Sequence, residues 1–152
     1  MITETSFFLL PSTFFLAVIL LAVDPGRDKC GVAVMDDRTI LDRAVVPAPR
    51  LVEFVTNWSS RYGVKRILVG DRTGSKEIVQ LVASHLPDLP LTLVAETGTT
   101  LDARKRYFQE HPPRGWRRFL PVTLQVPSRP YDDYAAVVLA ERFLDSMSIN
   151  TK

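Results

Sequence analysis

The chain has 152 residues, about the size of one domain with a core of its own. Hydrophobic residues make up 46% and charged residues 24% of the chain, which excludes disorder over most of the length and excludes collagen-like or coiled-coil chains. A net charge of +2 does not by itself indicate a nucleic-acid-binding protein. The single cysteine, Cys30, excludes an internal disulfide and fits the reducing cytoplasm, and one cysteine with two histidines cannot supply a zinc ligand set.

The N-terminal region is strongly apolar. Residues 7–23 read FFLLPSTFFLAVILLAV, so a signal or membrane segment has to be weighed. The run has no basic flank, and residues 11–13 (PST) break it, which leaves about ten apolar residues where a span needs about 20. We therefore expect a buried central strand over residues 18–24, no membrane partner, an N-terminal extension of unknown role over residues 1–16, and one domain over residues 17–148.

Alternating and helical patterns define the elements that follow. Leu51, Val55, Trp58 and Tyr62 recur at spacings of four and three before Gly63, as in an amphipathic helix that ends at a glycine. Together the patterns predict strands over 31–36, 39–46, 66–71 and 91–95 and helices over 51–62, 75–85, 99–110 and 132–147.

Two features mark the C-terminal third. Thr99, with Asp102 three residues later, resembles a capping box at the start of the helix over 99–110. Residues 112–130 are rich in proline and predict a long loop of functional use.

Three meandering strands followed by two helix-plus-strand units predict an α/β fold. The expected mixed sheet has five strands, three antiparallel and then two parallel, with helices on both faces. The ribonuclease H-like fold is the best-known arrangement of this kind.

Acidic residues fall where the predicted elements begin or end. Asp24, Asp71 and Glu96 end or follow strands, and Asp132 and Asp133 start the last helix. Neighbouring strands lie about 4.8 Å apart, so carboxylates at adjacent strand ends can bridge two Mg²⁺ or Mn²⁺ ions about 4 Å apart. Taken singly, each acid equally fits a turn or a helix N-cap. Taken together, they predict a two-metal site that needs no protein nucleophile.

Basic residues cluster late in the chain. Residues 104–118 carry six basic side chains against one acidic, with Tyr107, Trp116 and, just beyond, Phe119 among them. This mixture favours phosphate contacts and stacking on bases, although a solvated helix face with aromatics turned into the core would read similarly. The predicted nucleic-acid-binding residues are Arg27, Lys29, Arg72, Lys76, Arg104, Lys105, Arg114, Trp116, Arg117, Arg118 and Arg129.

Three blocks resemble one known family. Residues 24–34 (DPGRDKCGVAV) resemble the opening Asp-x-Gly-x-x-x-x-Gly-Val-Ala-Val of the YqgF (RuvX) family of RuvC-like proteins with a ribonuclease H fold. Residues 96–104 (ETGTTLDAR) resemble its Asp-Glu-Arg-x-(Ser/Thr)-Thr-x-x-Ala-Arg block, and residues 132–141 (DDYAAVVLAE) its C-terminal helix start. The likeness implies Asp24, Glu96 and Asp132 as metal ligands and endonucleolytic maturation of pre-16S ribosomal RNA, or Holliday-junction resolution.

The chain departs from that family pattern in three places, as in its divergent cyanobacterial-type branch. Thr97 replaces the arginine after the glutamate, residues 70–76 (GDRTGSK) replace a Gly-x-Pro loop, and residues 109–129 are longer and richer in proline. Relatives with this fold place a metal-binding acid at the end of the strand beside the first. Asp71 is therefore expected to complete a trio with Asp24 and Asp132, and Glu96, about 9.6 Å out, to reach the metals less directly.

Three functions follow from these observations. The first is a Mg²⁺- or Mn²⁺-dependent endonuclease acting on structured RNA or branched DNA, as a monomer or a homodimer. The second is a catalytically weak or inactive nucleic-acid-binding or ribosome-associated module on the same fold. The third, an actin-like nucleotide binder, normally needs two such domains.

Overall fold

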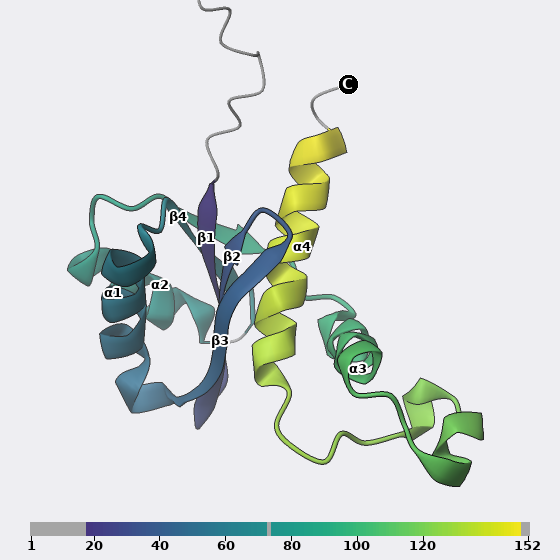
Figure 1. The fold of residues 1–152 in the computed structure, drawn as a ribbon. Helices are drawn as coiled ribbons and strands as arrows, with labels where there is room; N and C mark the ends of the chain where they lie inside the picture. Colours follow the sequence, from purple (N-terminus) through teal and green to yellow (C-terminus); the bar gives the residue numbers. More distant parts are fainter. Residues whose placement is uncertain (1–17, 73, 150–152) are drawn as a thin grey trace, which may run out of the picture.

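The computed structural model describes residues 18–72 and 74–149 (Figure 1). Its elements follow the predicted order: β1 (Ile19–Asp24), β2 (Lys29–Asp36), β3 (Thr39–Pro47), α1 (Leu51–Tyr62), β4 (Arg66–Gly70), α2 (Ser75–His85), β5 (Leu91–Val94), α3 (Thr99–Glu110) and α4 (Asp132–Ile149). Three short 3₁₀ turns, which were not predicted, are η1 (Ala48–Arg50), η2 (Gly115–Phe119) and η3 (Val122–Leu124). The predicted strands and helices are confirmed, with boundaries that shift by at most two residues.

The five strands form one mixed sheet in the order β3-β2-β1-β4-β5. β1 pairs antiparallel with β2, and β2 with β3, whereas β1–β4 and β4–β5 are parallel. β1 lies at the centre, and the side chains of Leu20 to Val23 are completely buried. The N-terminal apolar run therefore ends in a central strand, as its composition predicts.

Helices cover both faces of the sheet (Figure 1). Because successive side chains of a strand point to opposite faces, Leu21 and Val23 pack in one core with α1 and α2, and Leu20 and Ala22 in a second core with α4. Even-numbered positions of β1 and β4 thus face α4, and odd-numbered positions face α1 and α2. This alternation decides which strand-end residues can meet.

Helix α3 packs against α4 through a third, smaller core that contains Ala103, Tyr107 and Tyr134. The predicted capping box does not form, because α3 starts one residue earlier than the box requires: Gly98 takes the cap position with φ 75°. Asp102 instead forms an ion pair with Arg142 of α4, with Nη2 2.7 Å from Oδ2.

None of the helices within residues 18–72 and 74–149 combines the length and the apolarity that crossing a membrane requires. The proposed extension over residues 1–16 lies outside the described residues.

Candidate functional site

Asp24 is the last residue of β1 and lies at the centre of the candidate site. As an even-numbered residue its side chain faces α4, and only 4% of it is exposed. Its Oδ1 atom is buried, and the described residues supply no hydrogen-bond donor to it. A carboxylate oxygen left in this state at the end of a central strand is a signal of function, because burying such a group without a partner costs stability.

Gly31 brings the start of α4 to Asp24. Gly31 pairs with Asp24 across the β1–β2 ladder. A Cβ atom at Gly31 would lie 1.8 Å from the backbone oxygen of Asp132, so only glycine lets the helix approach this closely. Asp132 consequently lines the same groove as Asp24, with its Oδ2 3.5 Å from Lys29 Nζ.

Glu96 reaches Asp24 from the loop after β5, across the end of β4. A Cβ atom at Gly70 would lie 1.6 Å from Glu96 Oε1, so the side chain of Glu96 occupies the space that any other residue at position 70 would fill. Glu96 is buried there, and its carboxyl group lies near enough to Asp24 to raise the pKa of Asp24. The two carboxyl groups are therefore neighbours, although β1 and β5 are not adjacent in the sheet.

Asp71 takes a different position from the one expected. Gly70 faces α4, so Asp71 follows on the opposite side of the strand. Its side chain is exposed, and its Oδ1 accepts a hydrogen bond from the backbone N–H of Glu96 at 3.0 Å. In this structure Asp71 holds the loop that carries Glu96, and it is Glu96 that lies against Asp24.

Arg72 is the cation that now neutralises this pair of acids. Its Nε forms an ion pair with Glu96 Oε2, and its Nη2 donates to Thr100 Oγ1 at 3.2 Å. Sequence analysis listed Arg72 only as a contact for nucleic acid and missed the part of Gly70 and Thr100. The one signal was the unusual segment 70–76, which replaces the family loop.

Burial and mutual repulsion change the acidity of both carboxyl groups. Desolvation, then the charge of Glu96, raises the pKa of Asp24 to about 7, against the opposing effect of Arg72. Desolvation likewise raises the pKa of Glu96, and the Arg72 guanidinium again opposes it. Burial and repulsion thus favour the protonated form of both carboxyl groups, and a metal cation is one partner that could replace the proton.

Asp24 and Asp132 open onto a groove of about 390 Å³. Acids and bases both line it, together with the prolines that precede α4; the charged members are Asp24, Lys29, Arg72, Arg129 and Asp132. A groove with carboxylates at its base and cations at its rim suits an anionic chain such as a phosphodiester backbone.

Asp133 lies apart from this groove. Its Oδ2 is 2.6 Å from Arg43 Nη1 of β3, and it lines a separate hollow beside Glu110. Asp133 Oδ1 is buried without a donor among the described residues. The structure therefore places Asp24 close to Glu96 and, in the groove, to Asp132, and it leaves Asp133 in a separate hollow and Asp71 on the opposite side of its strand.

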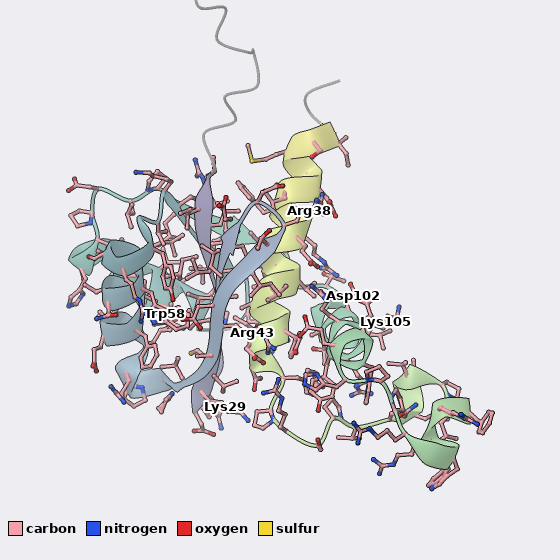
Figure 2. All side chains as sticks on the ribbon, viewed as in Figure 1. Lys29, Arg38, Arg43, Trp58, Asp102 and Lys105 are labelled. Atoms are coloured by element: carbon pink, nitrogen blue, oxygen red, sulfur yellow. The ribbon has the colours of Figure 1, made fainter. Side chains whose placement is uncertain are left out.

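The predicted nucleic-acid-binding residues occupy three settings. Lys29, Arg72 and Arg129 line the groove. Arg104 is used inside the fold, where Nη1 donates to the backbone oxygen of Thr123 at 3.0 Å. The remaining ones are exposed on loops or helices: Arg27, Lys76, Lys105, Arg114, Trp116, Arg117 and Arg118. Figure 2 shows Lys29 near the lower end of the sheet and Lys105 out to the right beside α3.

Tyr107 differs from the expectation that it interleaves with the basic residues as a stacking platform. It is buried between α3 and α4, where its ring meets that of Tyr134 edge to face at 5.6 Å between centroids. Helical periodicity places Tyr107 on the side of Ala103, which faces α4, so it belongs to the core.

The donor set suits a hard divalent cation. Within residues 18–72 and 74–149 no three acidic, histidine or cysteine side chains are gathered closely enough to hold a metal as they stand. The oxygen-only chemistry of Asp24, Glu96 and Asp132, and the buried Oδ1 of Asp24 that lacks a donor, nevertheless fit Mg²⁺ or Mn²⁺. Such an ion would have to take the place of the Arg72 guanidinium on Glu96.

The chain is similar to bacterial proteins of known family, although no family model matches it. A protein of Bacteroides fragilis named "Putative pre-16S rRNA nuclease" is 28% identical over 99 residues, 57% of this chain and 72% of the relative. A protein of Porphyromonas gingivalis with the same name is 25% identical over 140 residues, 84% of this chain and 96% of the relative.

Solved structures show the same fold. A RuvC structure from Thermus thermophilus matches with a TM-score of 0.54 and 14% identity, over 86% of this chain and 96% of that one. The Fowlpox virus resolvase, solved with Holliday junction DNA, matches with a TM-score of 0.55 and 10% identity, over 85% of this chain and 98% of that one. These likenesses and the sheet order confirm the predicted ribonuclease H-like fold.

Proposed function

The chain is a divergent relative of the YqgF (RuvX) family, and on that premise we propose that it is a Mg²⁺- or Mn²⁺-dependent endonuclease that cleaves phosphodiester bonds in structured RNA. One observation supports the proposal: the buried Asp24 at the carboxyl end of β1 has Glu96 and Asp132, from two other segments, as acidic neighbours, and it opens onto a groove that Lys29, Arg72 and Arg129 also line. The names of the bacterial relatives favour precursor 16S ribosomal RNA as the substrate and the bacterial cytoplasm as the location.

Asp24, Glu96 and Asp132 would hold the metal, and Asp71 and Asp133 are left to support them. Asp71 fixes the backbone of Glu96, and Asp133 anchors the start of α4 to Arg43. Bound Mg²⁺ or Mn²⁺, two ions in this proposal, supplies an activated water and stabilises charge on the leaving oxygen, which removes the need for a protein nucleophile.

The cations at the rim position the substrate. Lys29 lies beside Asp132, and Arg129 also lines the groove, so both can contact phosphates of a substrate bound there. Arg72 pairs with Glu96 in this structure, and with a metal in its place on Glu96 its guanidinium would be free to make a third phosphate contact. It would thereby supply the guanidinium that Thr97 cannot, although it comes from a different loop.

Cleavage by wild type and by Asp24→Asn tests the proposal. End-labelled pre-16S leader RNA and a four-way DNA junction are incubated with each protein in Mn²⁺ and in EDTA. We expect RNA cleavage that needs the metal and is absent in Asp24→Asn. The matched control is Asp88→Asn, because Asp88 is an exposed acid in the turn before β5, at the opposite end of the sheet.

Each alternative outcome has a definite meaning. Cleavage that survives in Asp24→Asn contradicts the mechanism. If the protein cleaves the four-way junction in preference to the RNA, the proposed substrate becomes branched DNA, the kind of ligand solved with the Fowlpox virus resolvase. Binding without cleavage by the folded wild type selects the inactive binding module, in which Arg72 permanently occupies Glu96.

A further inference from the structure

The segment between α3 and α4 forms an arm that projects from the molecule. We use "the arm" for residues 112–126, which include η2 and η3 and extend beyond α3 at the lower right of Figure 1. Trp116 is 71% exposed and Phe119 76% exposed. In a 3₁₀ helix with three residues per turn, positions 116 and 119 lie on the same side of η2, so the two rings present one apolar surface to solvent.

This exposure is built into the arm. Gln125 is buried, and its Nε2 donates to the backbone oxygens of Arg117 and Leu120, both at 2.9 Å. Arg104 of α3 holds the arm from the other side through the backbone oxygen of Thr123. These bonds satisfy the turn carbonyls and fix the backbone, so the two aromatic rings are presented on a shaped support rather than on a free loop.

The charge of the arm identifies the kind of partner. Residues 112–126 contain three arginines and no acidic residue. Arg118 lies over the ring of Phe119, with Cζ 4.8 Å from its centroid. Exposed rings next to arginines suit a partner that has both negative charges and flat apolar faces. Unpaired nucleotides offer phosphates and free base faces, whereas in a duplex the base faces are buried by stacking.

The arm is also continuous with the groove. Its arginine-bearing continuation, Arg129, lines the groove that contains Asp24 and Asp132, and its guanidinium lies over the ring of Tyr107 at 5.7 Å. A strand held on the arm can therefore pass along Arg129 toward the acids.

We propose that the arm binds single-stranded RNA, with Trp116 and Phe119 stacking on unpaired bases and Arg114, Arg117 and Arg118 contacting phosphates. This deepens the proposed function and rests on it for the identity of RNA as the polymer. It specifies that the substrate carries an unpaired stretch next to the bond that is cleaved.

Tryptophan fluorescence tests the proposal directly. The chain has two tryptophans, and Trp58, a residue of α1, is only 7% exposed and packs into the core (Figure 2). Quenching by added RNA therefore reports on Trp116. The full chain is titrated in EDTA, which prevents metal-dependent cleavage, with an unstructured 12-nucleotide RNA and with a blunt RNA duplex of equal length. We expect strong quenching by the single strand and little by the duplex.

Paired variants separate stacking from charge, with affinities measured by anisotropy of labelled RNA. Trp116→Ala should weaken single-strand binding roughly five- to hundredfold and change duplex binding less than twofold. The double variant Arg117→Ala/Arg118→Ala should reduce the salt dependence of RNA binding. The slope of the logarithm of the binding constant against the logarithm of the salt concentration should fall by about 0.7 for each phosphate contact that is lost. Leu81→Ala and Arg61→Ala, exposed residues of α2 and α1 across the sheet, are the matched controls.

Two results would overturn the proposal: unchanged single-strand affinity in Trp116→Ala, or an equal loss for single strand and duplex. Self-association that disappears in Trp116→Ala, with unchanged RNA affinity, would make the arm an interface between copies of this chain and would equally overturn it. The binding titration contains no metal, so its result is independent of cleavage. If the arm binds single-stranded RNA but the protein does not cleave, the nuclease proposal fails and the arm proposal stands. If the protein cleaves but the arm does not bind, only the arm proposal fails.

Discussion

The acidic groove and the arm use opposite arrangements of charge. At the base of the groove, the carboxyl groups of Asp24 and its neighbour Glu96 are buried at or just after the ends of strands, and Arg72 forms an ion pair with Glu96. In the arm, arginines and aromatic rings are exposed, with no acid among residues 112–130. The groove depends on a rigid sheet to force like charges together, whereas the arm needs only an exposed turn with fixed carbonyls. Cleavage and binding should therefore be separable by mutation.

The largest effect is expected at Asp24. Asp24→Asn keeps the size of the side chain and removes a charged metal ligand, so cleavage should fall roughly a thousandfold or more, given that a bound metal contributes several kcal/mol to the transition state. Binding of single-stranded RNA to the arm should be unchanged. Single-turnover cleavage and anisotropy, measured on the same preparation, check both; a parallel loss of binding would show that the two regions are not separable.

Gly70→Ala should act almost as strongly without touching a charge. Its Cβ would collide with Glu96 Oε1, at 1.6 Å, so Glu96 must leave Asp24. We expect roughly a hundredfold slower cleavage, the cost of misplacing a catalytic group by about 1 Å. Gly63→Ala is the control, because Gly63 ends α1 with φ 65° and a Cβ there meets nothing within 4 Å. Equal kcat values for Gly70→Ala and Gly63→Ala would show that the position of Glu96 does not matter for cleavage.

Arg72→Ala should raise the affinity for metal while it slows cleavage. Removing the guanidinium from Glu96 eliminates a competing cation, and we expect roughly tenfold tighter Mn²⁺ binding, since a nearby charge shifts a carboxyl equilibrium by one to three pKa units. Calorimetric titration with Mn²⁺ measures this without any substrate. Lys76→Ala, an exposed cation of the same segment, should leave the affinity as in wild type; weaker binding in Arg72→Ala would contradict the exchange.

The buried Asp24 should also give the metal-free protein a distinctive pH dependence. Its folded pKa of about 7 exceeds the ordinary value of 3.8, so the folded protein holds a proton that the unfolded chain releases between these values. The free energy of unfolding should therefore fall as pH rises from about 4 to 7. Asp24→Asn should flatten this slope. The difference in the free energy of unfolding, variant minus wild type, should therefore be at least about 1 kcal/mol larger at pH 8 than at pH 4.

Urea denaturation in EDTA at pH 4, 5.5, 7 and 8 measures this effect. The same slope in wild type and Asp24→Asn would show that Asp24 is ionised in the folded protein. Asp88→Asn serves again as the exposed control.

The smallest effect is expected at Arg129, which joins the two regions. Arg129→Gln removes one phosphate contact from the groove but leaves the acids and the arm intact, so KM should rise roughly three- to tenfold with kcat within twofold. Steady-state cleavage at two salt concentrations checks this, because the difference from wild type should shrink at high salt. A selective loss of kcat would place Arg129 at the reacting phosphate.

Much of the fold could be predicted from local patterns. The run that ends at Asp24 is apolar at every position, which fits a strand buried on both faces, and the spacing from Leu51 to Tyr62 before Gly63 fits a helix with a left-handed glycine at its end. The cluster of acids at strand ends was also readable, because parallel strands bring their carboxyl ends to one edge of the sheet.

The composition of that cluster could not be read in the same way. Strand distance alone favoured Asp71 over Glu96, since β4 lies beside β1 and β5 does not. The alternation of side chains turns Asp71 away, and the missing side chain of Gly70 leaves room for Glu96 to cross β4. Tyr107 was likewise expected to interleave with the basic residues as a ring for stacking on bases, but it belongs to the core of α3 and α4.

The sequence by itself determined which elements form, their order and the acidic and basic character of two regions, because periodicity, glycines and charge act over a few neighbouring residues. Only the tertiary structure decided which acids meet, which cation neutralises them and which aromatic rings remain exposed. Those outcomes depend on contacts between segments far apart in the chain, where a shift of one residue turns a side chain to the other face of the sheet.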